Sequence, residues 1–178
     1  CACAGARKVV SVISYSAGTS ACEKGGEGQR ALRLLSDMVG ARLEPNVISF
    51  SAAISACEKT SECKHALDLL SAMRNHAVTA DVISYSAAIS ACEKSRDTHS
   101  WARALMLLRE MDHVVLAPNV ITYNAALSAC EKRGEWSLAL TLLDELIERK
   151  LVPNDITFSV CMQVYNLLAD YCKSMIFM

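Results

Sequence analysis

The sequence lacks several features that would assign it to a particular class of protein. It has no apolar run of the 18 or more residues that a membrane-spanning helix needs. Only 3 of its 178 residues are proline, 6% are aromatic, and the formal net charge of −1 gives no general attraction to polyanions. A polyanion site would therefore have to be a local stripe. The 52% of apolar residues can form a buried core, which argues against a disordered chain.

Cysteine is abundant, but its pattern does not indicate a metal site or a disulfide framework. The chain has nine cysteines and no Cys-x-x-Cys pair. Four of them occupy the same place in a repeated phrase: Cys22, Cys57, Cys92 and Cys130. Free cysteine commonly behaves as a small buried hydrophobe. We therefore expect buried thiols and no metal, in preference to metal ligands or disulfides, and a reducing compartment.

One phrase occurs four times and organises the chain. It reads VISYSAGTSACEK at Val12–Lys24 and recurs at Val47–Lys59, Val82–Lys94 and Val120–Lys132, with a decayed fifth copy from Asp155. The spacing is 35 residues except for one step of 38, and a fixed period of this size predicts a solenoid.

The period divides the chain into repeats. The predicted units are a tail or repeat remnant at 1–11, repeats at 12–46, 47–81, 82–119 and 120–154, and a partial repeat or cap at 155–178. The three extra residues of the third repeat fall between its two helices, near Ser95–Trp101. Because the chain opens with Cys1 rather than Met, we expect a fragment or a processed product.

Each repeat contains two helical patterns. Counting places from the opening residue of a repeat, places 4, 7, 8 and 11 form one apolar helix face, as in Tyr85, Ala88, Ile89 and Cys92. A second segment reads Ala-Leu-x-Leu-Leu-x-x-Met, as in Ala66–Met73. A turn follows, usually Pro-Asn, in which proline is expected to end one helix and Asn or Asp to cap the next. The result is a series of helical hairpins that must stack to bury their apolar faces.

These residues resemble pentatricopeptide repeats over about residues 12–170. The resemblance rests on the 35-residue period, the V-I-S/T-Y/F-S/N opening, Ala at place 20, Met at place 27 and Pro-Asn or Asp at places 34–35. Tetratricopeptide repeats fit less well, because their period is 34 and their Trp, Leu-Gly and Tyr positions are not reproduced. The resemblance implies an all-α, right-handed α-solenoid of stacked helix-turn-helix repeats. It also implies an organellar location, plastid or mitochondrion, with plastid preferred.

The resemblance further implies binding of single-stranded RNA on the concave face, with one base per repeat. In the family, places 5 and 35 select the base, the residue at place 2 wedges between bases, and a lysine at place 13 lies near phosphates. The implied reading pairs are Ser16 with Asn46, Ser51 with Asp81, Ser86 with Asn119, and Asn124 with Asn154. The implied wedges are Ile13, Ile48, Ile83 and Ile121, and the implied phosphate contacts are Lys24, Lys59, Lys94 and Lys132. The family's code reads these pairs as 5′-A-G-A-C/U. Ser159 in the fifth copy has no clear partner, so no base is assigned there.

Each of these residues also has a purely structural interpretation. Ser or Asn at place 5 is favoured in the first turn of a helix, Asn or Asp at place 35 is an adequate cap, and the place-2 isoleucines could belong to the core. Each place-13 lysine follows a glutamate, so the local charge nearly cancels.

A second hypothesis is therefore a scaffold subunit of an organellar assembly. Such a subunit would contact protein through the concave face or the apolar end Met175–Met178. The span of four bases is also too short to select one transcript alone.

The sequence gives no support for an enzyme. Some members of the resembled family carry a zinc deaminase domain with the signature His-x-Glu followed by Pro-Cys-x-x-Cys. None of His65, His76, His99 or His113 is followed two residues later by Glu. We expect no catalytic residue, no cofactor and no small-molecule substrate.

Overall fold

A computed structural model of the protein describes the backbone of residues 11–176 and the side chains of residues 11–166. Within that range the chain forms nine α-helices and no strand. Their bounds are α1 Val12–Gly25, α2 Gly28–Gly40, α3 Val47–Lys59, α4 Cys63–Asn75, α5 Val82–Lys94, α6 Ser100–His113, α7 Val120–Glu131, α8 Trp136–Glu148 and α9 Asp155–Ile176. Most of the expected tail 1–11, and the side chains of the expected docking end Met175–Met178, lie outside the described residues.

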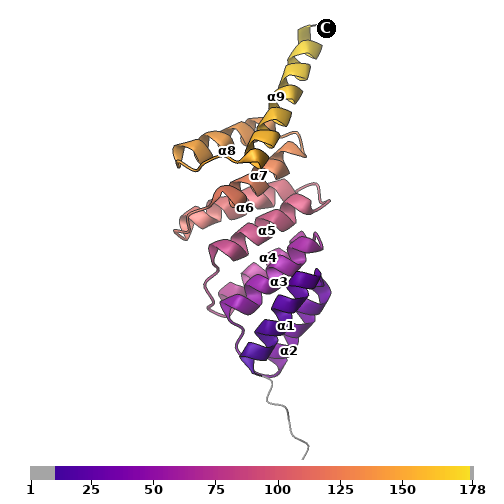
Figure 1. The fold of residues 1–178 in the computed structure, drawn as a ribbon, viewed down its shortest axis with the longest axis vertical. Coiled ribbons are helices and arrows are strands. Elements are labelled where there is room, and N and C mark those ends of the chain that lie inside the picture. Colours follow the sequence, from indigo (N-terminus) through magenta and orange to yellow (C-terminus); the bar gives the residue numbers. More distant parts are fainter. Residues whose placement is uncertain (1–10, 177–178) are drawn as a thin grey trace, which may run out of the picture.

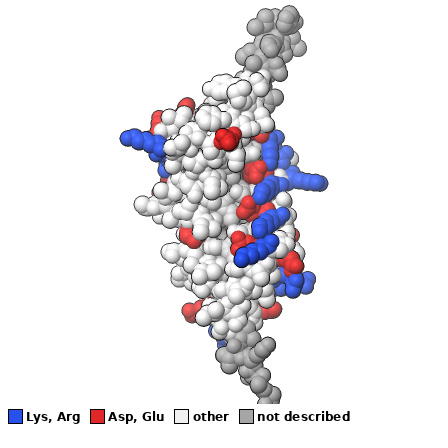
Figure 2. Space-filling model, in the orientation of Figure 1, with Lys and Arg blue, Asp and Glu red and all other residues white. Residues whose placement is uncertain are grey.

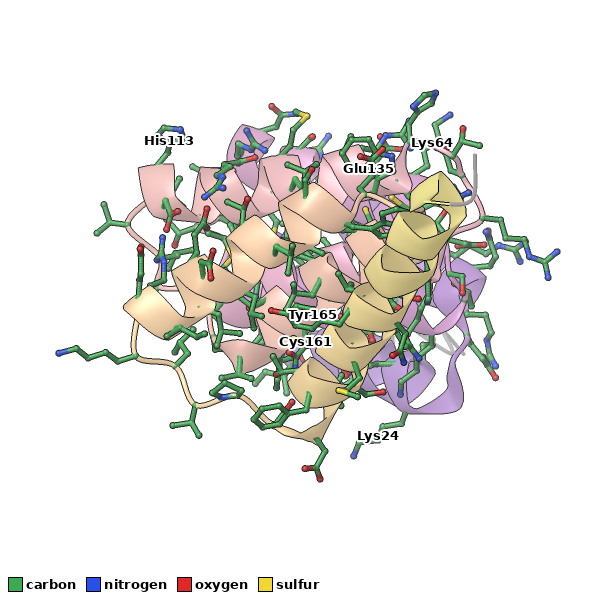
Figure 3. The ribbon with its side chains drawn as sticks, turned by 90° about the horizontal axis from the view of Figure 1, so that it is seen from above. Lys24, Lys64, His113, Glu135, Cys161 and Tyr165 are labelled. Atoms are coloured by element: carbon green, nitrogen blue, oxygen red, sulfur yellow. The ribbon has the colours of Figure 1, made fainter. Side chains whose placement is uncertain are left out.

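The helices stack as antiparallel hairpins along the long axis of the molecule, from α1 at the bottom of Figure 1 to α9 at the top. Each odd-numbered helix contacts the next odd-numbered helix and the even-numbered helix that follows it. Seen along the long axis in Figure 3, Lys24 of α1 lies on one side, and Lys64 of α4 and His113 of α6 lie on the other. The odd and even helices thus form two layers, and the predicted all-α solenoid is confirmed.

The core follows the predicted helix faces. Tyr85, Ala88, Ile89 and Cys92 of α5 are all buried, and the corresponding residues of α3 and α7 are buried too. The alanines let the odd helices approach one another closely, and the Leu-Leu-Met segments of the even helices close the other side.

The repeated cysteines are part of this core. Cys22, Cys57, Cys92 and Cys130 are buried and unpaired. Burial raises the pKa of the Cys57 and Cys130 thiols from 9.0 to about 12, so both stay protonated at neutral pH. Across the described residues, no group of His, Cys, Asp and Glu side chains could hold a metal ion.

The odd helices begin at the predicted caps. The side chains of Asn46, Asp81 and Asn119 accept hydrogen bonds from the backbone N–H groups three residues later. A side-chain oxygen in this position satisfies one of the otherwise unpaired N–H groups of the first turn. Asn154 does the same for Thr157 in α9, with a distance of 3.1 Å.

The expectation that proline ends the even helices is wrong. The helix α6 ends at His113, five residues before Pro118, and the chain reverses at Val115, whose φ is +59°. The N–H of Leu116 then donates to the carbonyl of Met111 at 2.8 Å. This is the bond expected where a residue with left-handed backbone closes the C-terminus of an α-helix. The loop after α4 has the same geometry at Ala77, with φ +53°, although alanine replaces proline at position 80. The left-handed residue therefore ends these helices, and proline only follows.

The extra residues of the third repeat lie in a surface loop. Loop 95–99 between α5 and α6 is the longest of the loops that join the two helices of a hairpin, and Trp101 lies just beyond it in the first turn of α6. Trp101 is partly buried and packs against the core. Among the described residues, no helix is both long enough and apolar enough to cross a bilayer.

Candidate nucleic-acid interface

The place-2 isoleucines form a ladder on the surface of the odd helices. Ile83 is 64% exposed although its neighbours Ser84 and Tyr85 are buried. The equivalent side chains in the other repeats are also exposed: Ile13, Ile48, Ile121 and Ile156. An apolar side chain repeated at one exposed place is not part of the core. The structure thus contradicts the interpretation of the place-2 residues as core residues and leaves them free to contact a ligand.

The residues at places 5 and 35 meet across each repeat boundary. Ser16 Oγ lies 3.4 Å from Asn46 Oδ1, although the carbonyl of Val12 is a closer acceptor for its proton at 2.9 Å. Asn124 Nδ2 donates to Asn154 Oδ1 at 2.8 Å. The place-5 side chains are almost fully buried, whereas Asn154 is exposed. The two members of these pairs are about 30 residues apart in sequence, and the stacking of successive hairpins brings them together.

In the two middle pairs the connection passes through a third residue. Ser51 Oγ lies 2.8 Å from Ser84 Oγ, which donates to Asp81 Oδ1 at 2.7 Å. In the next repeat, Ser86 Oγ lies 2.7 Å from Thr122 Oγ1, which donates to Asn119 Oδ1 at 2.9 Å. The third residue is a Ser or Thr at place 3 of the following repeat, which is not among the predicted site residues. The signal was present, because place 3 is Ser or Thr in every copy of the phrase.

A depression lies directly over the fourth pair, Asn124 with Asn154. It has a volume of about 200 Å³ and is lined by Asn124, Asn154 and the exposed side chains of Ile121 and Ile156. Polar groups lie between two apolar walls that belong to successive repeats. Such a site can hold a flat, polar ring and contact both its edge and its faces.

The place-13 lysines lie along one edge, and most have partners in the preceding repeat. Lys94 Nζ lies 2.8 Å from Glu58 Oε1, and Lys132 pairs in the same way with Glu93. Lys59 Nζ instead donates to the backbone carbonyl of Glu23 at 2.6 Å. Figure 2 shows positive and negative side chains interleaved in a column beside a surface with few charges. The column is thus close to neutral, as the Glu-Lys pairs of the sequence indicated.

Comparison with protein families identifies the repeats. A family model described as pentatricopeptide repeat domain matches residues 9–60, 33–95 and 68–133, and one described as PPR repeat family matches residues 118–166. Together the matches cover residues 9–166, most of the chain. A search of curated proteins found no match.

Solved structures show the same fold. The pentatricopeptide repeat protein PPR10 in complex with an 18-nucleotide psaJ RNA element matches with a TM-score of 0.72 and 22% identity, over 89% of this chain and 24% of that one. The structure of PPR10 from maize matches with a TM-score of 0.67. The repeat domain of Arabidopsis thaliana protein-only RNase P 1 in complex with tRNA matches with a TM-score of 0.70 and 16% identity, over 84% of this chain and 80% of that one. The chain spans about a quarter of PPR10.

Proposed function

The chain belongs to the pentatricopeptide repeat family, and we propose that it binds single-stranded RNA along the surface of its odd helices, one base per repeat. The observation that carries this proposal is the last repeat boundary, where the Asn124–Asn154 pair and two exposed isoleucines line one depression, together with the exposed isoleucine at place 2 of every repeat. The matched PPR10 structure contains RNA, which supports the same class of ligand. We further propose a role in plastid or mitochondrial RNA metabolism, without catalysis by this segment.

The helix caps determine what each place-35 residue offers to a base. The backbone N–H of Thr122 needs an acceptor, so Asn119 directs its Oδ1 inward and its Nδ2, a donor, outward. Asp81 uses Oδ1 in the same way toward Ser84 and presents its second carboxylate oxygen, an acceptor. Asn46 and Asn154 behave like Asn119.

This difference supports the proposed site 5′-A-G-A-C/U. An outward acceptor at Asp81 suits the N–H groups on the pairing edge of guanine. An outward donor at Asn46, Asn119 or Asn154 suits the ring nitrogen acceptor of adenine or cytosine. The fourth base is C or U in the family's code, and the outward donor favours C.

The reciprocal pair Asp81→Asn and Asn119→Asp tests the proposal. Fluorescence anisotropy would compare AGAC with AAAC, AGGC and a scrambled RNA of the same composition. Asp81→Asn is expected to favour AAAC, and Asn119→Asp to favour AGGC. Loss of a hydrogen bond to a charged group costs about 1.5–3 kcal/mol, so each preference should change on the order of tenfold or more.

The matched control is Asp144→Asn on α8, which removes the same charge from an exposed place in the other layer. This variant should keep the wild-type preference for AGAC. Equal binding of all four RNAs would mean that the pairs are only helix caps.

A scaffold role is the second candidate, and one observation favours it. Phe158, Met162 and Tyr165 on α9 are exposed, although the same places are buried in α3, α5 and α7. This face could accept a further helix from a protein. Failure of the wild type to bind any RNA even at low salt would favour the scaffold role over RNA binding.

A further inference from the structure

The place-3 hydroxyls occupy the same position at all four repeat boundaries. Their side chains are completely buried, and each belongs to the first turn of an odd helix: Ser49, Ser84, Thr122 and Thr157. Buried hydroxyls are expected to have hydrogen-bond partners. At the last three boundaries the partners are the two side chains assigned above to base reading, and at the first boundary the partner is the place-35 residue.

The contacts repeat with small variations. Ser84 and Thr122 each bond to a place-35 side chain and a place-5 hydroxyl within 2.9 Å. Thr157 Oγ1 donates to Asn124 Oδ1 at 2.6 Å and lies 3.1 Å from Asn154 Oδ1. Only at the first boundary does the place-3 hydroxyl of Ser49 contact the place-35 residue alone, at 2.9 Å from Asn46 Oδ1.

The place-3 residue makes two separable contributions. Its backbone N–H forms the helix cap with the place-35 oxygen, as Ser84 N does with Asp81 Oδ1 at 2.8 Å. Its hydroxyl ties the two reading side chains together. Because Ser84 donates its proton to Asp81, the Ser51 hydroxyl donates either to Ser84 Oγ at 2.8 Å or to the carbonyl of Val47 at 2.7 Å. Without the Ser84 hydroxyl, Ser51 would donate to Val47 alone and lose its link to Asp81.

We propose that Ser49, Ser84, Thr122 and Thr157 are positioning residues that set base selectivity in the preceding repeat. Each hydroxyl holds the place-35 side chain in the orientation that the cap requires. At the last three boundaries it also holds the place-5 side chain beside it. The two polar groups that face a base then have a fixed separation and a fixed donor or acceptor character. This inference rests on the RNA-binding function proposed above and adds a third residue to each reading pair.

The test measures selectivity at one base while the others serve as internal references. Ser84→Ala keeps the backbone cap and removes only the hydroxyl. The preference for AGAC over AAAC should fall at least threefold, while the preference for AGAC over AGGC, which reports on the Ser86–Asn119 pair, should not change. Thr122→Val should lower the preference for AGAC over AGGC and leave the preference for AGAC over AAAC unchanged. The single variants Ser84→Thr and Thr122→Ser keep a hydroxyl and should retain the wild-type preferences, because both residue types occur at this place.

Two outcomes would overturn the inference while leaving RNA reading intact. One is unchanged selectivity in Ser84→Ala and Thr122→Val. The other is an equal loss of affinity for all RNAs, which would show that the hydroxyl only supports the fold. A wild-type protein that fails to distinguish AGAC from AAAC would instead refute the proposed function, so the two failures can be told apart.

Discussion

At the residue scale, the place-13 lysines are the side chains whose role changes most once their neighbours are known. The family resemblance implies that they form a row of phosphate contacts. The structure gives Lys94 and Lys132 a carboxylate partner from the preceding repeat. Exposed pairs of this kind contribute little to stability, but they neutralise charge that would otherwise attract a polyanion. The proposed RNA binding should therefore depend on base contacts and wedges more than on charge.

Removing the partner carboxylates tests this balance. The double variant Glu58→Gln, Glu93→Gln should bind RNA more tightly, because Lys94 and Lys132 become free to contact phosphates. The slope of log K against log salt should steepen by about 0.7 for each lysine that gains a phosphate. Binding measured by anisotropy over a salt series would show the change.

Glu145→Gln is the control for that experiment. It removes the carboxylate paired with Arg109 in the layer of even helices, where the ion-pair distance is 2.5 Å. It should leave the salt slope unchanged. A steeper slope in both proteins would mean that overall charge, and not the place-13 lysines, controls binding.

At the element scale, the ends of the even helices depend on single residues with left-handed backbone. Arg42, Ala77, Val115 and Lys150 all have φ between 53° and 59°, a region that favours glycine. Val115 is the least suited of the four, because its side chain is branched at Cβ. Its side chain is also 90% exposed, so little packing compensates for the strain.

Val115→Gly should therefore stabilise the protein. Left-handed backbone costs a residue with a side chain about 1–2 kcal/mol, and glycine avoids this cost. Glycine loses more conformational entropy on folding, which offsets about 0.5–1 kcal/mol of the gain in stability. The net gain of up to about 1.5 kcal/mol should raise the melting temperature by up to roughly 3–6 °C. Ala77→Gly in the equivalent loop should give a smaller gain. A lower melting temperature for Val115→Gly would show that the side chain makes a contribution that its exposure does not suggest.

At the scale of the whole molecule, stability is shared between neighbouring hairpins. The helix α5 lies in the middle of the stack and contacts α3, α4, α6 and α7. In such a solenoid each repeat depends on the interfaces with its neighbours. Damage to one central interface should therefore divide the molecule into two less strongly coupled parts.

Ala88→Leu introduces this damage, because Ala88 is completely buried in the centre of α5. Overpacking of this kind costs about 1–3 kcal/mol. We expect a broader urea transition, with a lower apparent m-value, because the two parts no longer unfold together. The control is Ala17→Leu, at an exposed place in α1. Equal and still sharp transitions for both variants would contradict the idea of local coupling.

The sequence by itself determined the repeats, the two helices of each hairpin, the buried faces and the caps at Asn46, Asp81 and Asn119. These features depend on residues within one or two helical turns of each other, so periodicity and capping chemistry are sufficient to predict them. The place-5 and place-35 residues of the candidate site recur in register, but their reading role was implied by the family resemblance and not by the periodicity. The sequence did not show how those residues are held.

Only the tertiary structure decided the features that join one repeat to the next. The bond between Ser86 and Thr122, and the ion pair of Lys94 with Glu58, each join residues 36 positions apart. The exposure of Ile83 likewise depends on which helix faces the stacking covers. The helix ends differ for another reason, since left-handed backbone was adopted by Val115 and Ala77, which do not favour it. No local pattern contains the contacts between repeats or the exposure of Ile83, because they arise from the packing of one hairpin on another.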